Sequence, residues 1–273
     1  MSARRTFSPR LRRATTPGWI WLPAAASLLL LSGPLVALFL AADWPGLPEL
    51  LARPASRTAL RLSLTTAGLS TVLCVLLGLP LAVLLSRLSG ALLQLFRGIL
   101  VVPLVLSPVV SGLALLYFWG RQGLLGSWLD AAGLAVGFTP AAVVVVQVFV
   151  SLPFFVVAAL GSIESVDSDL ELSAANAGAS AGQVLSHITL PLAAPGIIVG
   201  TLLAFARSLG EYGATITFAG SVAGRTRTLP LQIELALNSN DPEAALGIAL
   251  LLIGFYLIVL VLAGAGVNRV FRR

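Results

Sequence analysis

The ionisable side chains of this 273-residue sequence are few, and their types limit the chemistry that the chain can perform. His187 is the single histidine, Cys74 is the single cysteine, and lysine does not occur. The sequence therefore offers neither a metal-binding cluster nor a histidine-dependent catalytic triad. A nucleotide-binding P-loop is also excluded, because its lysine must reach the phosphates. We expect no catalytic residue, no metal site and no cofactor bound by the chain itself.

Arg207 and Glu211 are the charged residues whose spacing could matter, because they stand four residues apart near the end of an apolar run. On a continuous helix this spacing places one side chain above the other. Ionisable groups inside a membrane are costly, so they normally pair or face a water-filled path. Two interpretations stay open. The pair either closes a helix end near the outer membrane interface or lines a water-filled path through the membrane, or the gate of such a path.

The composition is that of an integral membrane protein. Hydrophobic residues make up 58% and charged residues 10% of the chain, whereas soluble domains carry about 25% charged residues. The net charge of +6 comes from arginine. Much of this charge lies at the two ends of the chain, where it suits anionic lipid headgroups better than nucleic acid. The expected partner of this surface is the lipid bilayer.

Six apolar runs are long enough to cross a bilayer, which takes about 20 helical residues. They are continuously apolar and do not alternate, so we expect an all-α fold with about six transmembrane helices and not a barrel. The run 19–42 is longer than a signal-peptide core and reads as a retained span that follows a basic tail at 1–17. The other runs are approximately 59–86, 98–119, 141–162, 192–214 and 244–267.

The distribution of arginine predicts that both termini are cytoplasmic, because cytoplasmic segments carry an excess of positive charge. The connection after the fourth span then also faces the cytoplasm. It is acidic at its start and has no arginine, with Glu164, Asp167, Asp169 and Glu171. An acidic surface on this side of the membrane suits a protein partner.

The segment 171–195 (ELSAANAGASAGQVLSHITLPLAAP) is the most distinctive connection between spans. Helix propensity is high from Glu171, and Asp169 or Ser168 could cap the helix start. Gly178 interrupts this helix, and a second short segment is expected to end at Pro191. Small side chains would let a partner pack closely against such a knob. The alternative is a solvated connector.

The residues of this segment resemble a known motif. Ser173-Ala174, Gly178 four residues later, and Ile188-Thr189-Leu190-Pro191 are similar to the EAA loop of bacterial ABC-importer permeases, which docks on the ATPase subunit. Leu172 is a departure, because it stands where the family commonly has Glu, and Glu171 is one position earlier. The resemblance implies a set of docking residues: Glu171, Ser173, Ala174, Gly178, Ile188, Leu190 and Pro191.

The resemblance extends over most of the chain. The stretches 104–112 (LVLSPVVSG), 204–218 (AFARSLGEYGATITF), 224–233 (GRTRTLPLQI) and 240–245 (NDPEAA) are similar to the molybdate branch of type I importers. Sulfate/thiosulfate permeases share S-L-G-E-Y-G and T-L-P-L and are the nearest alternative, and tungstate is a third possible substrate.

The resemblance implies a MetI-like permease domain at 18–273 in the cell membrane, with the docking loop at about 164–191. It also implies partners: ATP-binding cassette ATPase subunits that hold ATP and Mg, an extracytoplasmic oxyanion-binding protein, and a second copy of the permease. A proton-coupled secondary transporter is a different class of function, but Glu211 is the single acidic residue near a span interior. A membrane enzyme is weaker still, because the spans hold no paired carboxylates or activated nucleophile.

Three smaller patterns give further expectations. Gly196, Gly200, Ala204 and Ser208 recur every four residues, which predicts a small-residue face for packing within the chain or between two copies. The basic cluster 224–228 is either a solvated outer loop or a contact for the binding protein. Asp241 followed by Pro242 predicts the capped start of the last helix.

Overall fold

The computed structural model describes residues 17–271, and it describes side chains up to Leu262. The basic tail expected at 1–17 therefore lies, apart from Pro17, outside the described residues. The chain divides into two units, Met1–Ala42 and Asp43–Arg273. In the first unit, η1 (Gly18–Ile20) leads into α1 (Trp21–Ala41), in which no residue is buried. A helix that is apolar on all sides and uncovered by protein is typical of a membrane span.

The described helices of the second unit follow one another without any strand. In chain order they are α2 (Leu47–Ala52), α3 (Pro54–Arg87), α4 (Gly90–Val105), α5 (Pro108–Trp119), α6 (Gly126–Ala131), α7 (Pro140–Glu164), α8 (Ser168–Asn176), α9 (Ala181–Val184), η2 (Leu185–Thr189), α10 (Leu190–Leu209), α11 (Gly213–Phe218), α12 (Leu229–Asn238) and α13 (Pro242–Phe271).

Among the described residues, five helices have the length and composition to cross a membrane, and a sixth span results if α4 and α5 are counted together. The expected all-α fold with about six spans is therefore confirmed. The run expected as a span at about 98–119 is broken, because α4 and α5 meet at an angle of 115°. Pro108 explains the break: it disfavours helical geometry at Ser107, which is extended (φ −62°, ψ 148°) and caps α5 by accepting from Val110 N.

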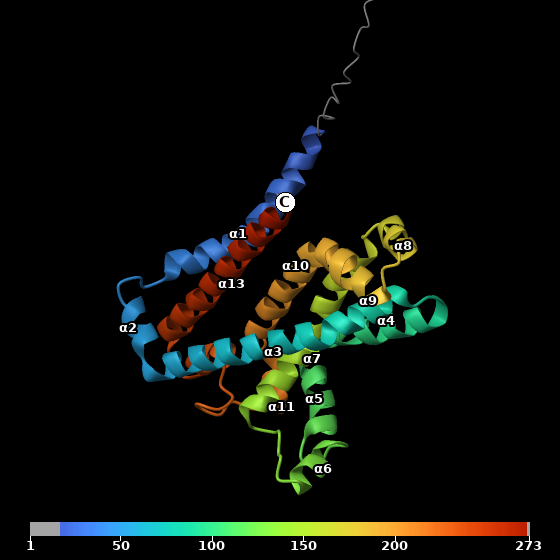
Figure 1. The fold of residues 1–273 in the computed structure, drawn as a ribbon. Coiled ribbons are helices and arrows are strands. Elements are labelled where there is room, and N and C mark those ends of the chain that lie inside the picture. Colours follow the sequence, from blue (N-terminus) through green and yellow to red (C-terminus); the bar gives the residue numbers. More distant parts are fainter. Residues whose placement is uncertain (1–16, 272–273) are drawn as a thin grey trace, which may run out of the picture. The chain divides into compact units, whose positions relative to one another are not determined.

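The core of the second unit forms where α3, α7 and α10 lie side by side (Figure 1). Small residues allow this close approach. A Cβ atom at Gly200 would lie 3.0 Å from the Phe155 carbonyl oxygen, and one at Gly196 would collide with the Ser162 side chain. Ala204 and Ser208 on the same face are fully buried. The expected packing of this face within the chain is thus confirmed.

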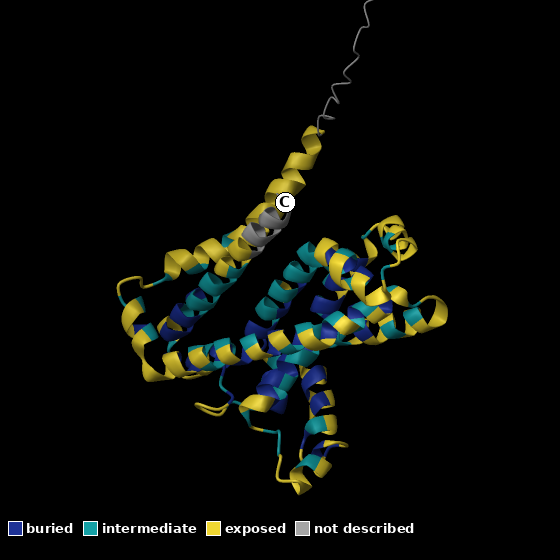
Figure 2. Ribbon diagram, viewed as in Figure 1, coloured by how far each residue is buried: buried dark blue, intermediate teal, exposed yellow. Residues whose placement is uncertain are grey.

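Buried and exposed residues alternate along α3, whereas α7 is buried over most of its length and α10 is mostly of intermediate exposure (Figure 2). Cys74 is fully buried in the core cluster, as expected for a small hydrophobe. Three buried hydroxyl groups satisfy one another between the helices: Ser70 donates to Ser208 at 3.0 Å, and Ser151 lies 2.9 Å from Ser208. Such pairing removes the cost of burying polar atoms.

The start of α13 is as predicted. Pro242 is the first helical residue, and Asp241 accepts from the Ala244 backbone N–H at 3.1 Å. Arg53, just before α3, donates to the same carboxylate at 3.0 Å. Pro80, Pro103 and Pro153 lie inside α3, α4 and α7, which continue through them without a break in the helix.

Candidate docking site and charged pair

The knob expected between the fourth and fifth spans begins with α8 (Figure 1). Its N-cap is Asp167, whose carboxylate accepts from the Asp169 N–H at 2.9 Å. The predicted cap at Ser168 or Asp169 is therefore wrong by one or two residues, because Ser168 and Asp169 already lie inside the first turn. Asp169 and Glu171 both lie near the helix N-terminus, where the helix dipole favours negative charge.

Gly178 ends the first half of the knob, as predicted. Its φ of +94° lies in the left-handed region that favours glycine. The Gly178 N–H donates to Ala175 O and the Ala179 N–H donates to Ala174 O, both at 3.0 Å. This pair of bonds is a Schellman motif, which satisfies carbonyl groups at the end of α8.

The second half of the knob is continuous with the fifth span. Ser180 and Gln183 form a capping box at the start of α9, which leads through the π-helical η2 into α10. The expected end of this segment at Pro191 is wrong, because the helix continues through it. A π-helical turn spaces the backbone more widely, so the proline ring has room where an ordinary helical turn would bring it against a carbonyl.

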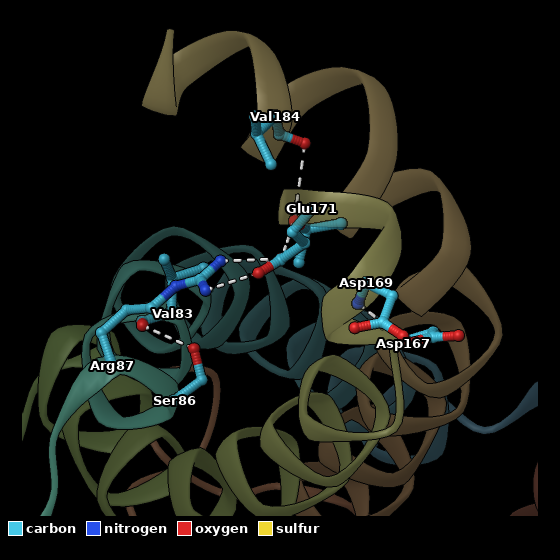
Figure 3. Close-up of polar contacts among 8 residues, drawn as sticks. Val83, Ser86, Arg87, Asp167, Asp169, Glu171 and Val184 are labelled. Carbon is cyan, nitrogen blue, oxygen red and sulfur yellow. Dashed lines mark hydrogen bonds and ion pairs between the residues drawn. The ribbon is translucent and has the colours of Figure 1, made fainter. Parts of the chain in front are cut away.

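The side chain of Glu171 points inward and joins three elements. Arg87, at the end of α3, donates to the Glu171 carboxylate through Nη1 and Nη2 at 2.7 and 2.8 Å (Figure 3). The hydroxyl of Thr189, at the end of η2, donates to the same carboxylate at 2.5 Å. The Arg87 guanidinium and then the Thr189 hydroxyl lower the pKa of Glu171 to about 2. We call these three residues the Glu171 clasp.

The acidic character of this connection is partly neutralised within the chain. Glu164 accepts from Arg97 at 2.6 Å, and Glu171 accepts from Arg87. Arg87 is the last residue of α3, and Arg97 lies inside α4. The expected acidic surface for a partner is thus reduced, because two of its four carboxylates are paired and Asp167 caps α8.

The other predicted docking residues lie at or near the surface. Ser173, Gly178 and Pro191 are exposed, whereas Ala174, Ile188 and Leu190 are half-buried. Leu170 and Leu172 are also exposed on this surface. Leu170 was not predicted from the sequence, and Leu172 was noted only as a departure from the motif. The knob carries two hollows: one of about 740 Å³, lined by residues that include Val83, Leu172, Ala175, Val184 and Leu185, and one of about 420 Å³, lined by residues that include Gly178, Gln183, His187 and Ile188.

Arg207 and Glu211 form an ion pair of 2.5 Å, as their spacing predicted. The helix does not continue to 214 as expected, because α10 ends at Leu209 and α11 starts at Gly213. Glu211 lies in this break with 2% of its side chain exposed, and its second oxygen accepts from the Ala214 N–H at 2.8 Å. Arg207 is 30% exposed. The arginine therefore neutralises a buried carboxylate that also caps α11.

The basic cluster at 224–228 is ordered by its own polar groups. Thr226 is fully buried; its hydroxyl accepts from the Val222 N–H at 2.8 Å and donates to the Gly220 carbonyl at 3.0 Å. Arg227 donates to the Ser221 hydroxyl at 3.1 Å. Arg225 is the exposed charge of the cluster.

These features fit a membrane subunit, and comparison with known proteins identifies its family. Residues 74–273 match the model of the binding-protein-dependent transport system inner membrane component. The chain belongs to this family. Over 249 residues it is 50% identical to the molybdenum transport system permease protein ModB of Mycobacterium tuberculosis, and the match covers 91% of the chain and 94% of that protein. It is 32% identical over 238 residues to the sulfate transport system permease protein CysW of Synechocystis, with 86% of each covered.

The fold agrees with this family. A bacterial alginate ABC transporter, solved in complex with its alginate pentasaccharide-bound periplasmic protein, contains a chain with a TM-score of 0.73 and 19% identity. The match covers 92% of the present chain and 93% of that chain. The permease is therefore a multi-pass inner membrane protein of the MetI-like fold.

Proposed function

We propose that this permease is the membrane subunit of an ATP-driven importer that carries molybdate into the cell. The single observation that supports molybdate is the 50% identity to a molybdenum permease across 91% of the chain. The relative named for sulfate transport is 32% identical over 86% of the chain. Sulfate or thiosulfate is therefore the weaker candidate, and tungstate resembles molybdate in charge and shape.

The energy for transport comes from a partner in this proposal. An ATP-binding cassette ATPase holds ATP and Mg, and it docks on the cytoplasmic knob formed by α8, Gly178 and the α9–η2 segment. The two hollows of about 740 and 420 Å³, whose linings share Ala179 and Val184, supply concave surface for it. Ser173, Ala174, Gly178, Ile188, Leu190 and Pro191 contribute to this surface, whereas Glu171 supports it from within. Both chain termini lie in the cytoplasm.

The opposite face receives the substrate. An extracytoplasmic oxyanion-binding protein delivers it near the outer loop that carries Arg225, and a second copy of the permease completes the translocation path. The solved alginate transporter is likewise in complex with a periplasmic protein, which binds an alginate pentasaccharide. Arg207 keeps a partly exposed positive charge beside this path, and Glu211 prevents it from holding an anion tightly.

ATP hydrolysis by the assembled complex tests the proposal. The permease is reconstituted with the candidate ATPase and its binding protein, and hydrolysis is measured with the binding protein loaded with molybdate, tungstate or sulfate. We expect stimulation by the molybdate-loaded binding protein and inhibition by vanadate. Stimulation by sulfate alone would replace the molybdate assignment with sulfate. A permease that binds no ATPase subunit would contradict the proposal.

A further inference from the structure

The packing of α8 leaves it with little apolar support. None of its nine residues is buried, and Glu171 and Ala174 alone are half-buried. Leu170 and Leu172 expose 49% and 60% of their surface. Hydrophobic burial, which fixes most helices against a protein, is thus largely missing here. Something else must hold α8 against the bundle.

The Glu171 clasp links α8 to the end of α3 and to η2. The Glu171 side chain is 18% exposed, and its oxygens accept three hydrogen bonds, two of them from a charged guanidinium. Two-point contacts between arginine and carboxylate are among the strongest hydrogen-bonded pairs and fix the relative orientation of the two groups. Because both carboxylate oxygens are occupied, Glu171 has little capacity left for a separate protein.

The local helix geometry explains how Thr189 reaches this carboxylate. The Leu190 N–H donates to Leu185 O, five residues back, so η2 contains one residue more than an α-helical turn. An added residue rotates the side chains that follow by about 100° around the axis. Thr189 is fully buried and its hydroxyl faces α8. Short π-helical turns are frequent at functional sites.

We propose that Arg87 and Thr189 are positioning residues that hold the Glu171 carboxylate and so couple a displacement of α8 to the α3 and α10 spans. This inference rests on the proposed function, because it takes the displacement of α8 from an ATPase subunit. The covalent route from α8 to α10 passes through the Gly178 turn, which has open space around it. The clasp gives a second connection to α10, and it gives the direct connection to α3.

Breaking the clasp should uncouple transport from ATP hydrolysis while the complex still assembles. The variants are Arg87→Ala and Thr189→Val, and the rescue variant is the charge exchange Arg87→Glu with Glu171→Arg. We expect uptake per ATP hydrolysed to fall about tenfold in Arg87→Ala, as for the loss of a charged hydrogen-bonded pair. The charge exchange should recover a large part of this loss.

The Arg97–Glu164 pair provides the matched control, because it lies on the same membrane face and both partners are about half-exposed. Arg97→Ala should therefore keep the wild-type ratio of uptake to hydrolysis. Thermal unfolding of each purified variant is measured in parallel. If the clasp has only a structural role, its variants will be less stable but will keep the wild-type ratio of uptake to hydrolysis. This result would overturn the inference.

Two further outcomes separate the clasp from the proposed function. If wild-type protein recruits the ATPase and transports, but Arg87→Ala fails to recruit the ATPase, then the arginine supports docking and the coupling role is wrong. If the wild type itself shows no ATP-dependent uptake, the proposed function fails and with it the basis of the inference. If Arg87→Ala and Thr189→Val both keep the wild-type ratio of uptake to hydrolysis, the coupling role of the clasp is wrong and the proposed function stands.

Discussion

Removal of Arg207 should destabilise the permease, because it leaves the Glu211 carboxylate buried without its counter-charge. Glu211 is 2% exposed and would retain the Ala214 N–H as its recorded hydrogen-bond donor. Loss of one partner from a buried ion pair costs about 3 to 5 kcal/mol. Since Arg207 is itself 30% exposed, we expect the lower end for Arg207→Met, about 3 kcal/mol. This is a large share of the ~5–15 kcal/mol that stabilises a typical protein.

The companion variant Glu211→Gln in the Arg207→Met background tests the reasoning. A glutamine oxygen can still accept from the Ala214 N–H and carries no charge, so most of the lost stability should return. Stability is measured by thermal unfolding of the purified proteins in one detergent. Wild-type stability of Arg207→Met, or no recovery in the double variant, would refute the account of this pair.

Transport by the same double variant distinguishes the two interpretations of the pair. If the pair closes a helix end, the stable double variant transports at the wild-type rate. If the pair lines the path, the double variant folds but loses uptake of the anion.

Three other predictions follow from the glycine positions and from the clasp. Gly178→Val should weaken ATPase docking, because a positive φ costs a residue with a side chain about 1–2 kcal/mol. Gly178→Asn should retain most docking. Equal pull-down of the ATPase by both variants would count against this prediction. Gly196→Leu should lower stability by about 1–3 kcal/mol through overpacking. Gly161→Leu should not lower it, because the Cβ position of Gly161 has open space around it. Thermal unfolding of the two purified variants measures the difference. The clasp holds the pKa of Glu171 at about 2, so its stabilisation is present above the ordinary carboxyl pKa and is lost as pH falls from about 4.5 toward 2. The wild type should therefore lose more thermal stability than Glu171→Gln over this range, and parallel curves would contradict the clasp.

Much of the fold follows from the sequence because membrane spans are long and continuously apolar. The runs that become α1, α7 and α13 needed no tertiary information, and neither did the Asp241 cap or the Gly178 turn, which depend on local backbone chemistry. The positions of the breaks were harder to predict. Pro108 marks the break between α4 and α5 in the sequence, but it does not fix the 115° angle between them. The apolar run likewise did not fix the end of α10 at Leu209.

The candidate site was predicted less completely than the fold. The motif located the knob, but it assigned Glu171 to a partner, whereas the carboxylate lies within the chain against Arg87 and Thr189. A signal for this was available: the acidic connection has no arginine, whereas the connection between the second and third expected spans carries Arg87 and Arg97 nearby. Which arginine meets which carboxylate depends on distances between helices far apart in the sequence, so the sequence pattern could not decide it.

Uptake into proteoliposomes is the measurement that tests the central claim most directly. Vesicles that contain the permease, its ATPase and ATP are supplied with the molybdate-loaded binding protein outside. The account predicts molybdate accumulation that requires ATP hydrolysis, stops with vanadate, and is absent when a pH gradient replaces ATP. Accumulation that follows the pH gradient and persists without ATP would show a proton-coupled transporter and contradict the account.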